Sequence, residues 1–293
     1  MKRQKSVTHT LSRMLLLAGL FLSFSLHAGI IYVNTNNVYG LNSATNFGKI
    51  DTTTGAYTNI ANFSQALGSL AFNPAAGNFY VTEGNSTLAT LRTLTDTGSL
   101  SSSTGTIGKT IYGMAYRTSD STLYAYDFDA DATGKINPST GAWTTLKTSA
   151  GPTVNTPLGG RLALLNGSLY GAINNQGISG KFGTYGFDAL TGFAQIGSNN
   201  NLFINMVLAT DGTTLYGLYA DGTAGNQKLY TINPSTGALT AGASISGTGL
   251  GTIFHGAAME TTQPPPLPEP PSLVLALTGL SAMWVARRRK HRV

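Results

Sequence analysis

Three aspartates are the side chains in this 293-residue sequence that are best placed to do chemistry together. Asp127, Asp129 and Asp131 alternate with apolar residues, so their carboxylates can share one face of a strand or surround a hard cation such as Ca²⁺ in a loop. An EF-hand loop would need Gly and Glu where the sequence has Ala132 and Pro138. Two interpretations remain: a calcium site of another kind, or a solvated turn, which we favour.

Histidine, on which most general acid–base catalysis and zinc binding depend, is scarce. Of the four histidines, His9, His27 and His291 lie near the ends of the chain, so only His255 belongs to its body. A Ser–His–acid site needs a nucleophile beside the histidine, and no such motif accompanies it. We therefore expect His255 to pack in the core or line a channel. Zinc sites built on several histidines are excluded by count.

Composition excludes further classes of function. Cysteine is absent, which removes disulfides, thiol catalysis and zinc–thiolate sites. The formal net charge of +6 comes from the two ends, because the body between Gly29 and Leu267 has nine Lys and Arg against eleven Asp and Glu, a net charge of −2. A nucleic-acid partner needs a basic face and is not expected. No Gly-rich phosphate loop is present either, so nucleotide binding has no support.

The body is built from a repeated turn between two strands. An Asp or Asn begins the turn and a Gly ends it, because Asx side chains close turns and Gly supplies a positive φ. The clearest copies are residues 48–57, 134–143 and 230–239, and the looser ones are 94–100 and 187–193. The turn glycines are Gly55, Gly98, Gly141, Gly192 and Gly237.

A second repeated feature is a strand with a tyrosine at its centre. The tyrosines are Tyr39, Tyr80, Tyr124, Tyr170 and Tyr216. An apolar strand precedes most copies, which gives four short strands in each period of about 45 residues, the pattern of a β-propeller. We expect the tyrosines to pack between blades; the alternative is that they form stacking platforms for sugars.

The ends of the repeat complement one another. The first unit, residues 30–61, lacks its leading apolar strand, and residues 252–259 form an apolar strand with nothing after it. Pairing the two would close the ring and remove its open edges. The sequence therefore predicts an all-β, five-bladed β-propeller, with blades at 68–107, 112–147, 160–197 and 204–244 and a composite blade. It resembles secreted propellers with degenerate repeats, without a WD or kelch signature.

Both ends of the chain have the composition of export signals. Residues 1–28 combine a basic start, an apolar run and Ala28 before a predicted cleavage point, as in a secretory signal peptide. The propeller domain is expected at 29–262. A proline-rich spacer follows at 263–271, and residues 272–293 contain a short apolar segment and a basic tail. The apolar run 273–286 is short for a bilayer, so we expect a temporary membrane tether.

The tail resembles the PEP-CTERM sorting signal of Gram-negative bacteria. The resemblance rests on Pro268, Glu269 and Pro270, the short apolar segment, and the basic residues Arg287, Arg288, Arg289 and Lys290. It implies export across the inner membrane, transient tethering there, and processing by an exosortase, a membrane protease. It further implies a final location at the cell surface or outside the cell, often together with exopolysaccharide.

These features favour an exported surface or matrix protein with a structural or binding role and no enzymatic activity. The signal peptide, the spacer and the sorting tail specify a destination, while the body has few residues capable of catalysis. Two alternatives remain: an extracellular carbohydrate-binding propeller, and a calcium-dependent secreted hydrolase or lactonase that uses Asp127, Asp129 and Asp131. No cofactor other than calcium is expected.

Overall fold

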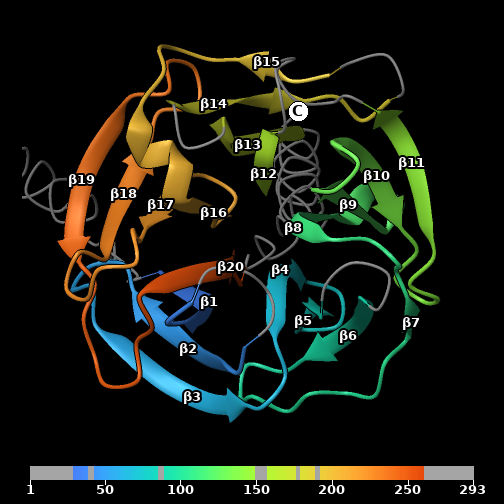
Figure 1. Ribbon diagram of the computed structural model, residues 1–293, viewed down its shortest axis with the longest axis horizontal. Helices are drawn as coiled ribbons and strands as arrows, with labels where there is room; N and C mark the ends of the chain where they lie inside the picture. Colours follow the sequence, from blue (N-terminus) through green and yellow to red (C-terminus); the bar gives the residue numbers. More distant parts are fainter. Residues whose placement is uncertain are drawn as a thin grey trace, which may run out of the picture.

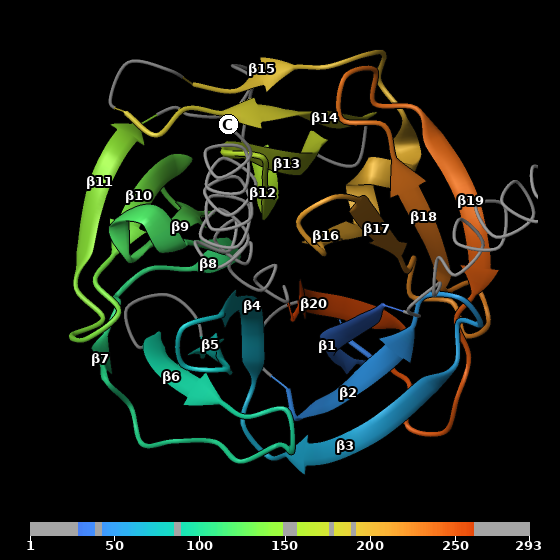
Figure 2. The same cartoon turned by 180° about the vertical axis from the view of Figure 1, so that it is seen from behind.

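Five sheets of four antiparallel strands form a closed ring in the computed structural model of the chain (Figures 1 and 2). The structure describes residues 29–38, 43–84, 89–148, 157–175, 179–188 and 192–260. The predicted all-β, five-bladed propeller is confirmed. The predicted signal peptide (1–28), the tail from residue 261 onward and Tyr39 lie outside the described residues. Within the described part, no helix is long and apolar enough to cross a membrane.

In each blade the strands follow one another from the channel outward, with the C-terminal strand innermost in blade 1. Blade 1 contains β20 (Ile253–Met259), β1 (Ile30–Asn36), β2 (Thr45–Asp51) and β3 (Tyr57–Phe63). Blade 2 contains β4 (Leu67–Asn73), β5 (Asn78–Glu83), β6 (Thr90–Leu94) and β7 (Gly105–Thr106). Blade 3 contains β8 (Ile111–Arg117), β9 (Thr122–Asp127), β10 (Ala132–Ile136) and β11 (Trp143–Thr148).

The remaining blades follow the same order. Blade 4 contains β12 (Pro157–Leu165), β13 (Ser168–Asn175), β14 (Ser179–Tyr185) and β15 (Ala194–Gln195). Blade 5 contains β16 (Met206–Thr210), β17 (Leu215–Tyr219), β18 (Lys228–Ile232) and β19 (Leu239–Ser244). The short 3₁₀ helices are η2 (Thr118–Asp120) and η3 (Asn201–Asn205). These strands begin and end within a few residues of the predicted blade limits.

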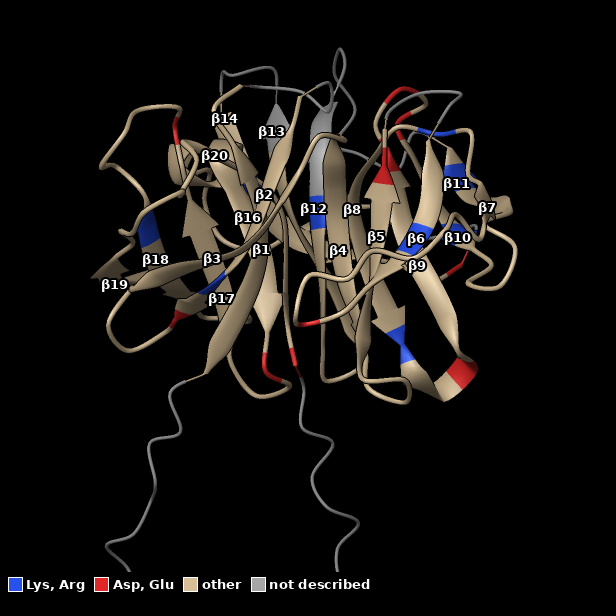
Figure 3. Ribbon diagram, turned by 90° about the horizontal axis from the view of Figure 1, so that it is seen from below, with Lys and Arg blue, Asp and Glu red and all other residues tan. Residues whose placement is uncertain are grey.

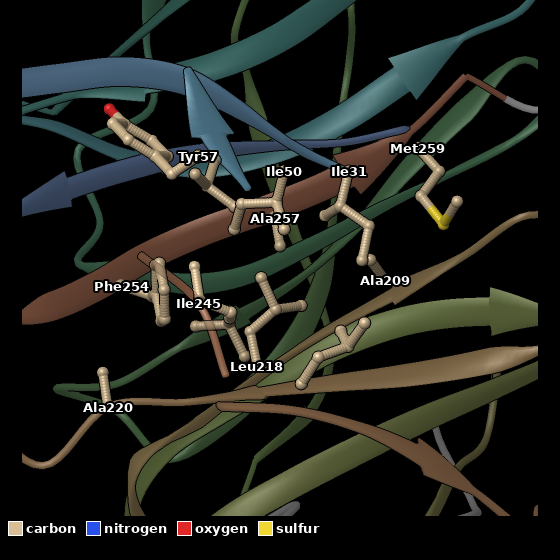
Figure 4. Packing of buried hydrophobic residues seen from close by; sticks show 13 residues of the cluster. Ile31, Ile50, Tyr57, Ala209, Leu218, Ala220, Ile245, Phe254, Ala257 and Met259 are labelled. Atoms are coloured by element: carbon tan, nitrogen blue, oxygen red, sulfur yellow. The ribbon is translucent and has the colours of Figure 1, made fainter. Parts of the chain in front are cut away.

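Pairing between the two ends of the body closes the ring, as the sequence predicts. Strand β1 pairs with β20 from Ile31 opposite Met259 to Asn36 opposite Ile253. The inner strand β20 also packs against β4 and β16, the inner strands of its two neighbouring blades. Figure 4 shows the buried apolar cluster that joins blade 1 to blade 5, to which β20 contributes Phe254 and Ala257. The closing strand therefore connects three blades.

The repeated turn has the predicted chemistry in its three clearest copies, whereas in blade 2 the hydroxyl of Thr95 closes the turn, accepting a hydrogen bond from the Ser99 N–H at 2.9 Å. In blade 1, Asp51 Oδ1 accepts hydrogen bonds from the backbone N–H groups of Thr53 (2.9 Å) and Thr54 (2.8 Å). Gly55, with a φ of +73°, donates its N–H to the Asp51 carbonyl at 2.8 Å. The same Asx turn begins at Asn137 and at Asn233, in blades 3 and 5. Local sequence thus dictates these outer hairpins.

The ring has two distinct faces. Residues near the beginning of the inner strands line one cavity, and residues near their ends line another, so all five inner strands run in the same direction. We call the face where they begin the front face and the face where they end the back face. Because Ile31 pairs with Met259, the described chain ends Gly29 and Glu260 both lie at the back face. In the side view of Figure 3, the acidic residues lie mostly at turns and strand ends, whereas basic residues also lie within strands such as β6 and β12.

Candidate functional site

Bulges in three inner strands place polar side chains in the central channel near the front face. In β8 the pairing with β9 skips Tyr112, and in β20 the pairing with β1 skips His255. In β4 the register shifts between Leu67 and Leu70, where Ser69 lies. A bulge disrupts the regular alternation of side chains and can redirect one toward a site. The three bulges therefore place Ser69, Tyr112 and His255 around one point of the channel.

A small cavity lies at this level of the channel. Its volume is about 10 Å³, and every inner strand contributes to its wall. The wall includes one residue from each of the five inner strands, namely Ser69, Tyr112, Arg161, Val207 and His255. A cavity of this size accommodates roughly one water molecule or one non-hydrogen atom of a ligand. We call it the front cavity.

Arg161, on β12, is the cationic side chain of the front cavity. Its Nη1 donates a hydrogen bond of 2.6 Å to the carbonyl oxygen of His255, and its guanidinium carbon lies 5.2 Å from the centre of the Tyr112 ring. Within the described part of the chain, no carboxylate forms an ion pair with it; the ion pairs found there involve Arg92, Lys109 and Arg117. Burial lowers the pKa of Arg161 to about 10, so the group remains charged at neutral pH.

His255 is the buried polar partner of Arg161. Its side chain is 2 % exposed, and its Nε2 atom has no hydrogen-bond partner among the described residues. Burial, and then the charge of Arg161, lower its pKa to about 3, although a hydrogen bond to the Val38 backbone raises it slightly. The imidazole is therefore neutral at physiological pH. Because Nε2 is the unpartnered atom, we assign the bonded proton to Nδ1, which leaves Nε2 as an acceptor. His255 lines the channel, which is one of the two placements that the sequence predicts.

An apolar belt separates the front cavity from a second pocket at the back face. The back pocket has a volume of about 80 Å³. The residues that line both spaces, one from each inner strand, are Leu70, Met114, Leu162, Leu208 and Ala257. The back pocket has the polar lining residues Tyr116, Thr118 and Thr210, whereas the guanidinium of Arg161 and the imidazole of His255 lie in the front half of the channel.

The structure places the three predicted aspartates at the front face but gives each its own protein partner. Asp127 ends β9 and forms an ion pair with Lys109 at 3.2 Å. In the following turn, Asp129 accepts a hydrogen bond of 2.6 Å from the hydroxyl of Thr110, and Asp131 accepts one of 2.5 Å from the hydroxyl of Tyr126. Across the described ranges, no group of three or more His, Cys, Asp or Glu is arranged to hold a metal ion.

This geometry predicts that calcium does not stabilise the protein. Asp127, Asp129 and Asp131 are held by separate partners and do not converge on one point among the described residues, so we expect the same melting temperature in EDTA and in millimolar CaCl₂. Differential scanning calorimetry of the full chain measures this directly, with MgCl₂ as the ionic control. A rise in melting temperature that calcium causes, that magnesium does not cause, and that Asp129→Asn abolishes would show that calcium binds here.

The repeated tyrosines that the structure describes pack within the protein. The Tyr80 ring lies 5.5 Å from that of Tyr116 in blade 3, and the Tyr124 ring lies 4.7 Å from that of Phe187 in blade 4. Tyr80 and Tyr124 are 9 % and 1 % exposed, so neither offers a free face to a sugar. Tyr170 packs against the apolar cluster between blades 4 and 5, and Tyr216 packs against the cluster between blades 1 and 5. The packing interpretation is favoured over the sugar-binding one.

The sequence did not reveal the residues that accompany His255 in the front cavity. Ser69, Tyr112 and Arg161 belong to no motif, and the bulges at Ser69 and Tyr112 depend on pairing with other strands. The one signal in the sequence was Arg161 itself, a lone charge within the otherwise uncharged strand Pro157–Leu165.

Comparisons with known proteins identify the fold alone. No protein-family model and no curated protein matches the chain. Similar solved structures include an engineered GH43 glycoside hydrolase with xylanase and arabinofuranosidase activities (TM-score 0.54, 11 % identity, 80 % of this chain and 53 % of that one). A chain of a nidogen/laminin complex has a TM-score of 0.50 at 13 % identity, over 80 % of this chain and 98 % of that one. TolB from Acinetobacter baumannii has a TM-score of 0.48 at 12 % identity, over 74 % of this chain and 53 % of that one. The chain thus spans about half the length of the TolB and hydrolase chains.

Proposed function

We propose that this chain is an exported protein that displays a β-propeller at the cell surface or in the extracellular matrix, where it binds a ligand rather than catalysing a reaction. The observation that carries this proposal is the polarity of the ring. Both described chain ends, Gly29 and Glu260, lie at the back face, whereas the front cavity with Arg161 and His255 lies toward the opposite face. A tether at the C-terminus would direct the front face away from the membrane.

The composition of the two ends supports export. Residues 1–28 read as a signal peptide, and Pro268, Glu269 and Pro270 precede an apolar segment and a basic end, as in PEP-CTERM proteins. An exosortase would process the tail after the inner membrane has been crossed. The propeller would then leave the membrane and reach the surface or the matrix.

The chemistry of the described residues supports binding over catalysis. His255 is neutral and its Nε2 has no partner among them, so it lacks the positioned nucleophile that base catalysis would require. Asp127, Asp129 and Asp131 are occupied by Lys109 and by hydroxyl groups rather than placed as a carboxylate pair. A polar cavity whose cation has no carboxylate partner within the described ranges is suited instead to holding a charged ligand.

Intact-mass spectrometry of the protein purified from its own host tests the export step. We expect a mature chain that lacks residues 1–28 and also lacks the basic end from Arg287 to Arg292, because both signals are removed during sorting. The control is the triple substitution of Pro268, Glu269 and Pro270 by Ala, which should retain the basic end. A native mass that corresponds to a chain retaining Arg287–Arg292 would contradict the sorting proposal.

A further inference from the structure

We propose that the front cavity binds a small hydroxycarboxylate, with Arg161 holding the carboxylate and His255 accepting a hydrogen bond from the hydroxyl. This inference deepens the binding role proposed above and rests on it. It does not depend on how the protein is exported, so the two can fail separately.

The anionic part of the ligand follows from the charge of Arg161. A partly buried guanidinium is costly to desolvate unless an anion or several acceptors compensate it. Among the described residues, Arg161 contacts one carbonyl oxygen, that of His255, and the face of the Tyr112 ring. Because a guanidinium has five N–H donors in a planar fork, it can hold a carboxylate through two parallel hydrogen bonds.

The hydroxyl of the ligand follows from His255. Its Nε2 is buried, accepts rather than donates, and has no partner in the part of the chain that the structure describes. An acceptor of this kind would repel a bare anion such as chloride, but it matches an O–H donor. A ligand that satisfies both neighbours must therefore present a negative group to Arg161 and a donor to His255.

The size of the cavity limits how much of the ligand enters. At about 10 Å³ it admits roughly one non-hydrogen atom, so the hydroxyl oxygen occupies the cavity and the rest of the ligand remains on its front side. Asp127, which pairs with Ile111 on the wall strand β8 at the front face, does not oppose an anion strongly because Lys109 neutralises it. The apolar belt below the cavity, which includes Leu70 and Leu162, prevents deeper entry.

Calorimetric titration of the purified full chain tests the ligand class with four compounds. Glycolate represents a small hydroxy acid and gluconate a sugar acid; acetate lacks the hydroxyl, and methyl glucoside lacks the carboxylate. We expect glycolate, gluconate or both to bind at least about tenfold more tightly than acetate, and methyl glucoside not to bind. Which of the two binds more tightly identifies the source of the ligand. Equal affinity for acetate and glycolate, competition by chloride alone, or no binding of either hydroxy acid at millimolar concentration would overturn the proposal.

Variants test the two residues separately. Arg161→Gln should weaken binding at least about tenfold because it removes the cation that holds the carboxylate, and the melting temperature of the free protein reports separately on the lost hydrogen bond to the His255 carbonyl. His255→Leu should reduce the affinity for glycolate to that for acetate, and it serves as the test if Arg161→Gln does not fold. The matched control is Arg117→Gln, which removes a guanidinium from the end of β8 at the back face. Unchanged binding in both channel variants would show that the cavity is merely structural.

Discussion

Ending the chain after Gly251, just before β20, is expected to abolish cooperative unfolding of the propeller, whereas ending it after Glu260 should leave the melting transition in place. The shorter chain loses the strand that pairs with β1 and packs against β4 and β16. It would expose an inner edge of blade 1 and open the ring. An unpaired, apolar edge of this kind favours aggregation.

The size of the effect follows from what β20 buries. Every residue of Ile253–Met259 is buried, and Phe254 and Met259 belong to the cluster in Figure 4 that joins blades 1 and 5. Truncating one large core side chain to Ala costs roughly 2–5 kcal/mol, and native domains are stable by only about 5–15 kcal/mol. Losing several such side chains together exceeds that margin. Calorimetry and near-UV circular dichroism of the two truncated chains provide the measurement. A normal transition in the chain that ends after Gly251 would show that ring closure is dispensable.

Replacing Gly55 by Ala is expected to lower the free energy of unfolding by about 2–5 kcal/mol, the sum of a left-handed backbone penalty and overpacking. The φ of Gly55 is +73°, and an added Cβ would lie 2.1 Å from the carbonyl oxygen of Ser244 in blade 5. The turn also exchanges hydrogen bonds with that blade: Ser246 donates to the Gly55 carbonyl at 3.1 Å, and Tyr57 donates to the Ser246 carbonyl at 2.8 Å. The blade 1 turn is therefore part of an interface between blades.

Gly77→Ala is the matched control for this prediction. Gly77 ends the same kind of turn, with its N–H donated to the Asn73 carbonyl at 2.9 Å and a φ of +63°, but an added Cβ would meet nothing within 4 Å. We expect Gly77→Ala to lower the free energy of unfolding only by the left-handed backbone penalty, roughly 1–2 kcal/mol. Urea denaturation of both variants separates the two contributions. Equal losses would mean that the contact with Ser244 adds nothing.

Ring closure and the candidate site depend on one another. His255 lies on the closing strand β20, and Arg161, which donates to its carbonyl, is 94 residues away in sequence on β12. The cavity wall takes residues from all five inner strands. Opening the ring should therefore remove the site as well as the stability, so ligand binding and cooperative unfolding should be lost together in the chain that ends after Gly251.

The sequence alone determined the number of blades, their limits and the closing pair of strands. These features depend largely on local sequence: an Asx side chain closes a turn and a glycine four positions later ends it, as at Asp51 and Gly55. The number and spacing of such turns predicted the five blades. The two incomplete ends predicted the closure, because an unpaired apolar strand has to find an edge.

Only the tertiary structure decided which side chains meet in the channel. The alternation that the sequence suggested for Asp127, Asp129 and Asp131 ends at a turn, where Lys109, Thr110 and Tyr126 supply partners. Conversely, the ring assembles Ser69, Tyr112, Arg161 and His255 from four blades without any shared motif. A bulge exists only relative to the strand it pairs with, and a channel exists only once the ring has closed. Neither can be read from the order of residues within one blade.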